Sequence, residues 1–440
     1  MLWKQAEATG WGRVHRATAA LARPERLSTL AAALAEGPVS MAGGLRAYGD
    51  AALNDGGRIV LTTRLDRLLD FDGAGGEVEA EAGVAIGDLL DFLLPHGWMP
   101  AVSPGTGFAT LGGCIAADVH GKNHGLAGSF GQHVRHLHLM DAAGKVRKLS
   151  PAREKTALRA TIGGMGLTGA IVSARIGLLP APSQMMEVDE RRMPDLDALM
   201  DGLASAPTPF SVAWIDATAK GLATGRGVLE EADFAQISDT PSARRALRVP
   251  LDAPGALLAP PVVRAFNSAY FHRIPEAGRT RNRPIRDFFY PLDRLHDWNR
   301  LYGKRGFHQV QYVVPEGDAR EVLHTCLTEI AASGLAAPLA VLKRLGEGRG
   351  GMLSFPMAGY TLAVDLAARP AAHPLAARLT ARVVEAGGRV YLAKDALTDA
   401  ASIAAMYPDL DAFRAAAEKL DPEGRFITDM ARRLKLREAA

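Results

Sequence analysis

The order of predicted elements in the last third of the chain constrains its fold more than any other feature. Between Phe307 and Lys394, alternating apolar residues predict strands, and apolar residues at helical spacing predict helices. In chain order these are the strand FHQVQYVVP, the helix EGDAREVLHTCLTEIAASG, the strands PLAVLKRLG and GYTLAVDLA, the helix PLAARLTARVVEAGG and the strand RVYLAK. This β-α-β-β-α-β order is typical of a split ferredoxin-like motif, an antiparallel sheet with both helices on one face.

Short strands and helices separated by turns are predicted from about Leu27 to Pro180. Strands are expected at Gly57–Thr63, Glu77–Val84 and Gly169–Pro180, a helix at Ala85–Gly97, and a strand-turn-strand unit at His133–Ser150. From Pro180 to about Asp287, prolines and polar runs instead predict linkers and mobile loops.

Size and composition limit the functions open to this chain. With 440 residues, 48% of them apolar, it should fold into two or three domains. Its 51 basic and 48 acidic residues leave a net charge of +3, which argues against nucleic acid as a partner. Neither Cys114 nor Cys326 has a metal-binding spacing, and we find no secretory signal or membrane span, so we expect a cytoplasmic protein without a metal. The apolar stretch Ala253–Val263 could be a loop over a pocket or a peripheral contact with a membrane, but its prolines favour an ordinary surface loop.

Three glycine-rich loops lie in the N-terminal part, at Met41–Ala51, Gly105–Gly113 and Gly163–Gly169. Their successive N–H groups can bind an anion, and glycine lets the backbone approach a ligand closely. The third loop contains GMGLTG, a literal GxGxxG, but a strand rather than a helix is predicted after it. No GxxxxGKS or GxxxxGKT occurs. We therefore expect neither a Rossmann dinucleotide site nor a nucleoside-triphosphatase loop.

The segment LGGCIAADVHGKNHG, Leu111–Gly125, brings Asp118, His120, Lys122 and His124 close together in the chain. Such a group is either a solvated loop or the wall of a site, and the neighbouring glycines favour a site. On an extended segment Asp118 and His120 would share one face. The sequence offers no GxSxG nucleophile elbow and no convergent set of zinc ligands.

Strands of the last third also carry polar side chains. Gln309 and Gln311 share one face of a strand, Lys343 interrupts an apolar strand, and Tyr391 and Lys394 stand at a strand end. Amides and amines presented in this way suit a polyhydroxylated or phosphorylated substrate. Because a half-exposed sheet face shows the same pattern, the residues alone leave the choice open.

Seven segments occur together in this chain: GLRAYGDAALN, SPGTGFATLGGCIAADVHGKNHGLAGSFGQHV, GGMGLTGAI, FFYPLDRLHDWNRLYG, FHQVQYVVP, RVYLAKDA and DMARRL. In this order, from about Gly10 to the C-terminus, they closely resemble the decaprenylphosphoryl-β-D-ribose 2'-oxidases of the vanillyl-alcohol-oxidase-like FAD flavoproteins. The resemblance implies an α+β fold with a PCMH-type FAD-binding domain at residues 1–182 and an antiparallel-sheet substrate domain at residues 183–394. Residues 395–440 would form a tail that packs back on the FAD domain.

The resemblance also implies the cofactor, non-covalent FAD, because Arg46 lies in the loop that carries the flavin-linking histidine of covalent relatives. The positions that would surround the reacting centre are Tyr48, His120 and Lys394. The positions that would bind FAD are Met41, Ala42, Gly43, Gly44, Leu45, Arg46, Ala47, Tyr48, Gly49, Asp50, Ala51, Gly105, Thr110, Leu111, Gly112, Gly113, Ala117, Asp118, Val119, His120, Ile171 and Tyr391. The positions that would line the substrate pocket are Lys122, Trp214, Phe289, Gln309, Gln311, Lys343 and Ala363.

The activity implied is the FAD-dependent oxidation of a sugar hydroxyl to a ketone, with a polyprenyl-phosphoryl ribose as substrate. A short-chain reductase would complete the epimerisation, a step of cell-wall arabinan synthesis. Two alternatives stay open: a flavin oxidoreductase of a soluble sugar, alditol or sugar acid, and a non-catalytic flavin- or sugar-binding protein. Ala363 stands where mycobacterial members carry a cysteine, and Phe289 stands where a tyrosine is usual. Residues Asp233–Asp287 would be a mobile cover over the pocket mouth and a contact for lipid or partner.

Overall fold

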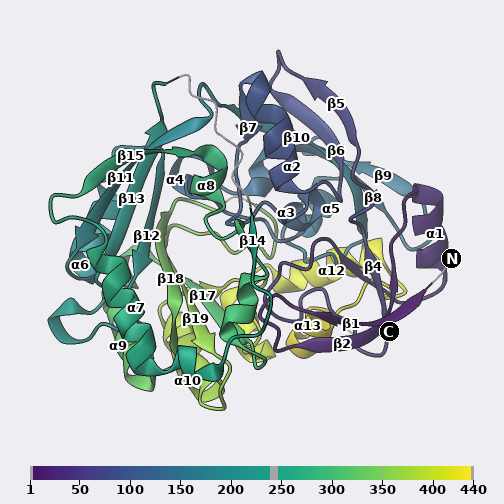
Figure 1. Cartoon of the computed structure of the whole chain (residues 1–440). Coiled ribbons are helices and arrows are strands. Elements are labelled where there is room, and N and C mark those ends of the chain that lie inside the picture. Colours follow the sequence, from purple (N-terminus) through teal and green to yellow (C-terminus); the bar gives the residue numbers. More distant parts are fainter. Residues whose placement is uncertain (1–2, 238–245, 349, 438–440) are drawn as a thin grey trace.

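The computed structural model describes residues 3–237, 246–348 and 350–437, which form three main sheets with helices between and around them (Figure 1). The N-terminal sheet has the order β1-β2-β4-β3, with β1 at Lys4–Thr9, β2 at Arg16–Ala22, β3 at Ser40–Ala42 and β4 at Arg58–Leu61. Strands β3 and β4 are parallel, and the first glycine-rich loop leaves the carboxyl end of β3. Ligands in open sheets of this kind bind outside the carboxyl ends of the strands.

The second sheet has the order β5-β6-β10-β8-β9, with β7 also beside β10. Its strands are β5 Leu68–Asp72, β6 Glu77–Glu81, β7 Trp98–Pro100, β8 Val134–Met140, β9 Val146–Leu149 and β10 Ala170–Pro180. The accompanying helices are α1 Leu27–Ala35, α2 Ile86–Leu93, α3 Leu111–Ala116, α4 His124–Ala127 and α5 Lys155–Thr161. The third glycine-rich loop leads directly into β10, as predicted, so the literal GxGxxG opens a strand and not a helix.

The third sheet has eight strands in the order β15-β11-β13-β12-β18-β19-β17-β20. The strands are β11 Met185–Met193, β12 Phe210–Ile215, β13 Gly227–Phe234, β15 Arg279–Pro284, β17 Phe307–Val314, β18 Ala336–Leu345, β19 Gly359–Ala367 and β20 Arg389–Val390. The helices α6 Leu196–Ala204, α9 Glu316–Ser333 and α10 Ala372–Glu385 pack against it. The predicted β-α-β-β-α-β order is confirmed, with α9 and α10 in contact with each other and with β17.

Alternation along these strands separates an apolar face from a polar one, because successive side chains of a strand point to opposite sides. Val310, Tyr312 and Val314 of β17 belong to the large apolar core under the helices. Gln309 and Gln311 point the other way and line a cavity. The predicted shared face of the two glutamines is therefore confirmed.

Two secondary-structure predictions were wrong. The expected strand RVYLAK ends at Val390, because the N–H groups of Lys394 and Asp395 bond to the carbonyl of Tyr391 in a turn. The region from Pro180 to Asp287, expected to be linkers and loops, contains four strands of the eight-stranded sheet and α7 at Pro260–His272. Its strand β11, MMEVDERRM, buries Glu190, whose charge is neutralised by arginines of β15, a contact that the sequence does not reveal.

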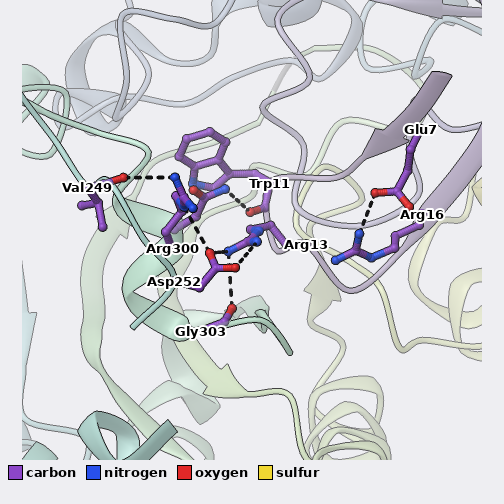
Figure 2. Close-up of polar contacts among 9 residues, drawn as sticks. Glu7, Trp11, Arg13, Arg16, Val249, Asp252, Arg300 and Gly303 are labelled. Atoms are coloured by element: carbon purple, nitrogen blue, oxygen red, sulfur yellow. Dashed lines mark hydrogen bonds and ion pairs between the residues drawn. The ribbon is translucent and has the colours of Figure 1, made fainter. Parts of the chain in front are cut away.

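The segment between β13 and β17 lies over one side of the cavity and is tied to the N-terminus. It contains β14 Leu247–Arg248, α7, α8 Ile285–Phe289 and β16 Leu295–His296. Arg13, in the turn between β1 and β2, contacts Asp252, which also pairs with Arg300 (Figure 2). Part of the predicted cover, residues 238–245, lies outside the described residues.

The C-terminal tail, with α11 Ala400–Met406, α12 Leu410–Leu420 and α13 Asp429–Leu434, lies beside the N-terminal sheet (Figure 1). Val39 forms a parallel bridge with Phe426, and Arg432 donates to Asn54. None of the helices in the described ranges combines the length and the hydropathy needed to cross a membrane.

Candidate active site

A cavity of about 930 Å³ lies between the glycine-rich loops and the polar face of the eight-stranded sheet. This volume is near the upper end of the range typical of ligand and cofactor sites. All three glycine-rich loops contribute to its wall, the third through Met165, Gly166 and Gly169. The three residues expected around the reacting centre and all seven expected for the substrate line the same cavity.

Most of the positions expected to contact FAD also line the cavity, but Gly49, Asp50, Leu111 and Asp118 do not. Asp118 has φ of 40°, so its segment is not extended and its side chain does not share a face with His120. Its buried carboxylate accepts hydrogen bonds from Ser129 Oγ at 3.0 Å and from the Gly131 N–H at 2.8 Å. Asp118 therefore stabilises the loop after α3 from outside the cavity, by bonding it to Ser129 and Gly131.

Lys394, Tyr48 and Asp365 form one cluster beside the eight-stranded sheet, and Lys394 and Tyr48 line the cavity. The ammonium of Lys394 lies 3.7 Å from the centre of the Tyr48 ring. Burial lowers the pKa of Lys394 to about 7, with Asp365 opposing that shift. Burial also raises the pKa of Asp365 to about 7, although its carboxylate accepts from Tyr302 Oη at 2.6 Å and from Gln309 Nε2 at 2.5 Å. A proton at this cluster can therefore move near neutral pH.

His120 is a buried, neutral imidazole. Gln311 Nε2 donates to His120 Nε2 at 2.9 Å and also contacts Thr361 Oγ1 at 3.1 Å. This hydrogen bond places the ring proton on Nδ1, which is buried and has no partner among the described residues. Burial, and secondarily the charge of Lys343, hold the pKa of His120 well below its usual range. The unused Nδ1–H is a donor for a bound oxygen atom.

Tyr391 supports this imidazole from the turn that follows β20. Its ring centre lies 5.3 Å from that of His120 and 4.7 Å from that of Phe355. Its hydroxyl donates to the Ala117 carbonyl at 3.0 Å, which joins the sheet to the loop after α3.

Lys122, two residues after His120, also lines the cavity. Its Nζ donates to the Phe288 carbonyl at 2.6 Å, lies 3.7 Å from the centre of that ring and stands 4.0 Å from Glu230. Burial lowers the pKa of Lys122 to about 7. Trp214 packs on Tyr270 and donates to the Pro338 carbonyl, whereas Phe289 is almost fully buried.

Sequence reasoning missed several residues of this site. Asp365, Tyr302, Glu230 and Phe355 become functional candidates only when strands and loops distant in the chain meet. The alternation in GYTLAVDLA could have indicated Asp365, which lies two residues after Ala363 on the same face.

A second cluster lies away from the cavity. Glu79 of β6 and His136 and His138 of β8 place their ligand atoms within 4.8 Å of one another. The sequence revealed no such set, because β10 separates the two strands in the sheet. Arg175 of β10 stands 3.8 Å from the Glu79 carboxylate and partly neutralises it.

The residues of the cavity fit a dinucleotide cofactor. Arg46 lies between the rings of Trp11 and Phe108, and its buried Nε has no partner among the described residues. Because buried donors are almost always hydrogen-bonded, this free N–H indicates that a polar ligand binds here. A side chain at Gly105 would meet no atom within 4 Å, so backbone there is open to the cavity.

Comparison with known proteins agrees with this geometry. The chain is 38% identical over 448 residues to decaprenylphosphoryl-β-D-ribose oxidase from Mycolicibacterium smegmatis, with 97% of each chain covered. The chain belongs to this family. A family model described as an FAD binding domain matches residues 18–150, and one described as D-arabinono-1,4-lactone oxidase matches residues 304–434.

Two further relatives are more distant. A Streptomyces coelicolor protein, named only as an uncharacterized protein in the mprA 5' region, is 35% identical over 367 residues, 79% of this chain and 99% of its own. A D-lactate dehydrogenase of Anaerostipes hadrus is 26% identical over 179 residues, 39% of this chain and 37% of its own. The protein is an FAD-dependent oxidoreductase with a PCMH-type FAD-binding domain and a second domain, as the resemblance implied.

Proposed function

We propose that this protein oxidises a secondary hydroxyl of a polyprenyl-phosphoryl ribose to the ketone. The observation that carries the proposal is the meeting of Lys394, Tyr48 and the free Nδ1–H of His120 in one cavity with the glycine-rich loops. The name of the relative that is 38% identical supplies the substrate class. In this proposal residues 1–182 and the 395–440 tail hold the cofactor, and residues 183–394 hold the substrate.

FAD, when bound, supplies the acceptor for the hydride that leaves the sugar carbon. The chain's own residues handle the proton of the hydroxyl. Lys394 Nζ takes up that proton, because a pKa of about 7 leaves much of the amine neutral at neutral pH. Tyr48 keeps the amine in place through its ring face, and His120 Nδ1 donates to the sugar oxygen.

The lipid part of the substrate would leave the cavity over the segment that follows β13. Six of the twelve large apolar side chains that are exposed in the described ranges lie there: Leu247, Leu251, Leu257, Val262, Phe266 and Leu301. Exposed apolar groups gathered in this way favour contact with a membrane or with lipid. We propose peripheral membrane contact through this segment, and a short-chain reductase that consumes the keto sugar.

The direct test is the visible spectrum of the purified holoenzyme before and after anaerobic addition of farnesyl-phosphoryl ribose. We expect the flavin absorbance to bleach. A spectrum that stays oxidised, but bleaches with a soluble pentose or alditol, would replace the lipid-linked substrate by the soluble one. A purified protein that takes up no FAD would overturn the proposal. Acid precipitation should release the flavin into the supernatant, because the cofactor is proposed to be non-covalent.

A further inference from the structure

Glu79, His136 and His138 lie together on the polar face of the second sheet, and none of them lines the cavity. Glu79 belongs to β6 and the two histidines belong to β8. Val78 and Leu137, which alternate with them along the same strands, are buried in the apolar core on the opposite face. The three polar side chains are partly buried, with exposures of 17%, 12% and 30% in chain order. The reaction proposed above uses none of them.

The three side chains converge above β10, the strand that separates β6 from β8 in the sheet. Glu79 and His136 both stand opposite Arg175 of β10, and His138 stands opposite Ser173. Strands two places apart in a sheet are separated by roughly 10 Å. The ligand atoms of the three side chains nevertheless all lie within 4.8 Å of one another. The side chains therefore lean from both sides toward one point.

The distances between these atoms match a metal site better than hydrogen bonds. His136 Nε2 lies 3.5 Å from one oxygen of Glu79, and His138 Nδ1 lies 3.7 Å from the other oxygen. A charge-assisted hydrogen bond between nitrogen and oxygen would be about 2.8 Å long. Two ligand atoms that each bind a tetrahedral zinc ion at about 2.1 Å are about 3.4 Å apart. The observed separations are thus close to those that a shared ion requires.

Arg175 neutralises the Glu79 carboxylate only in part, because its guanidinium is directed at other acidic groups. It donates to Glu77 and to Asp70, at 2.8 Å in both cases. Its distance to the Glu79 carboxylate is longer, 3.8 Å. In the described part of the chain we find no hydrogen bond to that carboxylate, only these longer ion-pair contacts. A partly buried carboxylate in this state gains from a bound cation.

The two imidazoles can offer lone pairs to an ion. Burial lowers the pKa of His138, although Glu79 opposes the shift, so the ring is neutral at neutral pH. A neutral imidazole is the form that binds a metal, whereas an ion pair with Glu79 would need the protonated form. Ser173 Oγ lies 3.0 Å from His138 Nδ1, so a hydroxyl group borders the same point above β10.

We propose that Glu79, His136 and His138 bind one zinc ion, with a water molecule beside Ser173 as the fourth ligand. Two imidazoles and one carboxylate are a ligand set that suits zinc. The ion ties β6 to β8, which are not neighbours in the sheet, and so stabilises this domain from the face opposite its core. The site differs from the expectation of a protein without a metal, because cysteine spacing carries no information about ligands that meet two strands apart.

The test uses the tag-free holoenzyme after treatment with a chelator and dialysis. Calorimetric titration with Zn²⁺ should show one site, and zinc at about 100 times its Kd should lower the unfolding equilibrium constant about 100-fold, which raises Tm. Glu79→Gln and His138→Gln each remove one ligand and should weaken zinc binding at least about 10-fold. His324→Gln, which removes an exposed histidine from α9, is the matched control and should bind zinc like the unchanged protein.

The proposal is supported if Glu79→Gln and His138→Gln keep full flavin content and the metal-free Tm of the unchanged holoenzyme, but lose the rise of Tm with zinc. If one of the two variants fails to fold, the other decides the test. Unchanged holoenzyme that shows no saturable zinc binding would overturn the proposal, and so would variants that bind zinc as tightly as His324→Gln. Because no substrate takes part, these results are independent of the proposed function.

Discussion

Arg433 of α13 joins the two loops that carry Tyr48 and Lys394. Its guanidinium makes two bonds to Asp50, at 2.7 and 2.8 Å, and one to Asp395 at 2.9 Å. Asp50 follows Tyr48 by two residues, and Asp395 is next to Lys394. Both carboxylates are almost fully buried, at 5% and 3% side-chain exposure. The C-terminal helix therefore holds the two sides of the Tyr48–Lys394 contact in register.

Arg433→Ala should cost stability and activity together. Removing one partner of a buried ion pair costs about 3 to 5 kcal/mol, and the one-quarter exposure of Arg433 favours the lower figure, about 3 kcal/mol. We expect the midpoint of thermal unfolding to fall by several degrees. Loss of register by about 1 Å at Lys394 should lower kcat by about 10- to 100-fold. Arg433→Lys should recover only part of the stability and part of kcat, because a point charge cannot bridge two carboxylates as a guanidinium does.

The assay measures unfolding, flavin content and steady-state rates on the same preparations. Arg16→Ala is the control, since the exposed pair of Arg16 with Glu7 is worth only about 0.5 kcal/mol. If Arg433→Ala unfolds at the same temperature as Arg16→Ala and keeps the kcat of the unchanged enzyme, the reasoning is refuted.

Three further predictions concern the cavity. Because only the neutral amine of Lys394 can accept a proton, kcat/KM should fall as pH drops below about 7, and Asp365→Asn should move that midpoint to lower pH. A pH profile that is flat from 5 to 9 would exclude Lys394 as proton acceptor. Gln311→Leu removes the donor to His120 and should lower kcat about 10-fold with full flavin content; an unchanged kcat would contradict the role given to that hydrogen bond. Cysteine-directed inhibitors should leave the mass of the protein unchanged, whereas Ala363→Cys, whose side chain would line the cavity, should gain one adduct.

The local pattern of apolar and polar residues was sufficient to predict a large part of the fold. Period-two alternation predicted β17 and the shared face of Gln309 and Gln311, because side-chain direction in a strand follows from the backbone alone. It also predicted that a strand would follow the GxGxxG, which excluded a Rossmann site. The prediction was wrong where polar residues are buried in pairs, as at Glu190 in β11, because the partner that neutralises the charge lies far away in the chain.

The sequence by itself therefore determined many of the elements outside residues 180–287, the glycine-rich loops and, through its resemblance to a family, the cofactor. Only the tertiary structure decided which polar residues meet. Asp50 and Arg433 are 383 positions apart, and no local pattern indicates that they touch. The backbone at Asp118 turns its carboxylate away from the cavity, whereas β18 presents Lys343 to it. The physical reason is that local backbone preference acts over a few residues, whereas burial and charge neutralisation depend on every segment that reaches the same point in space.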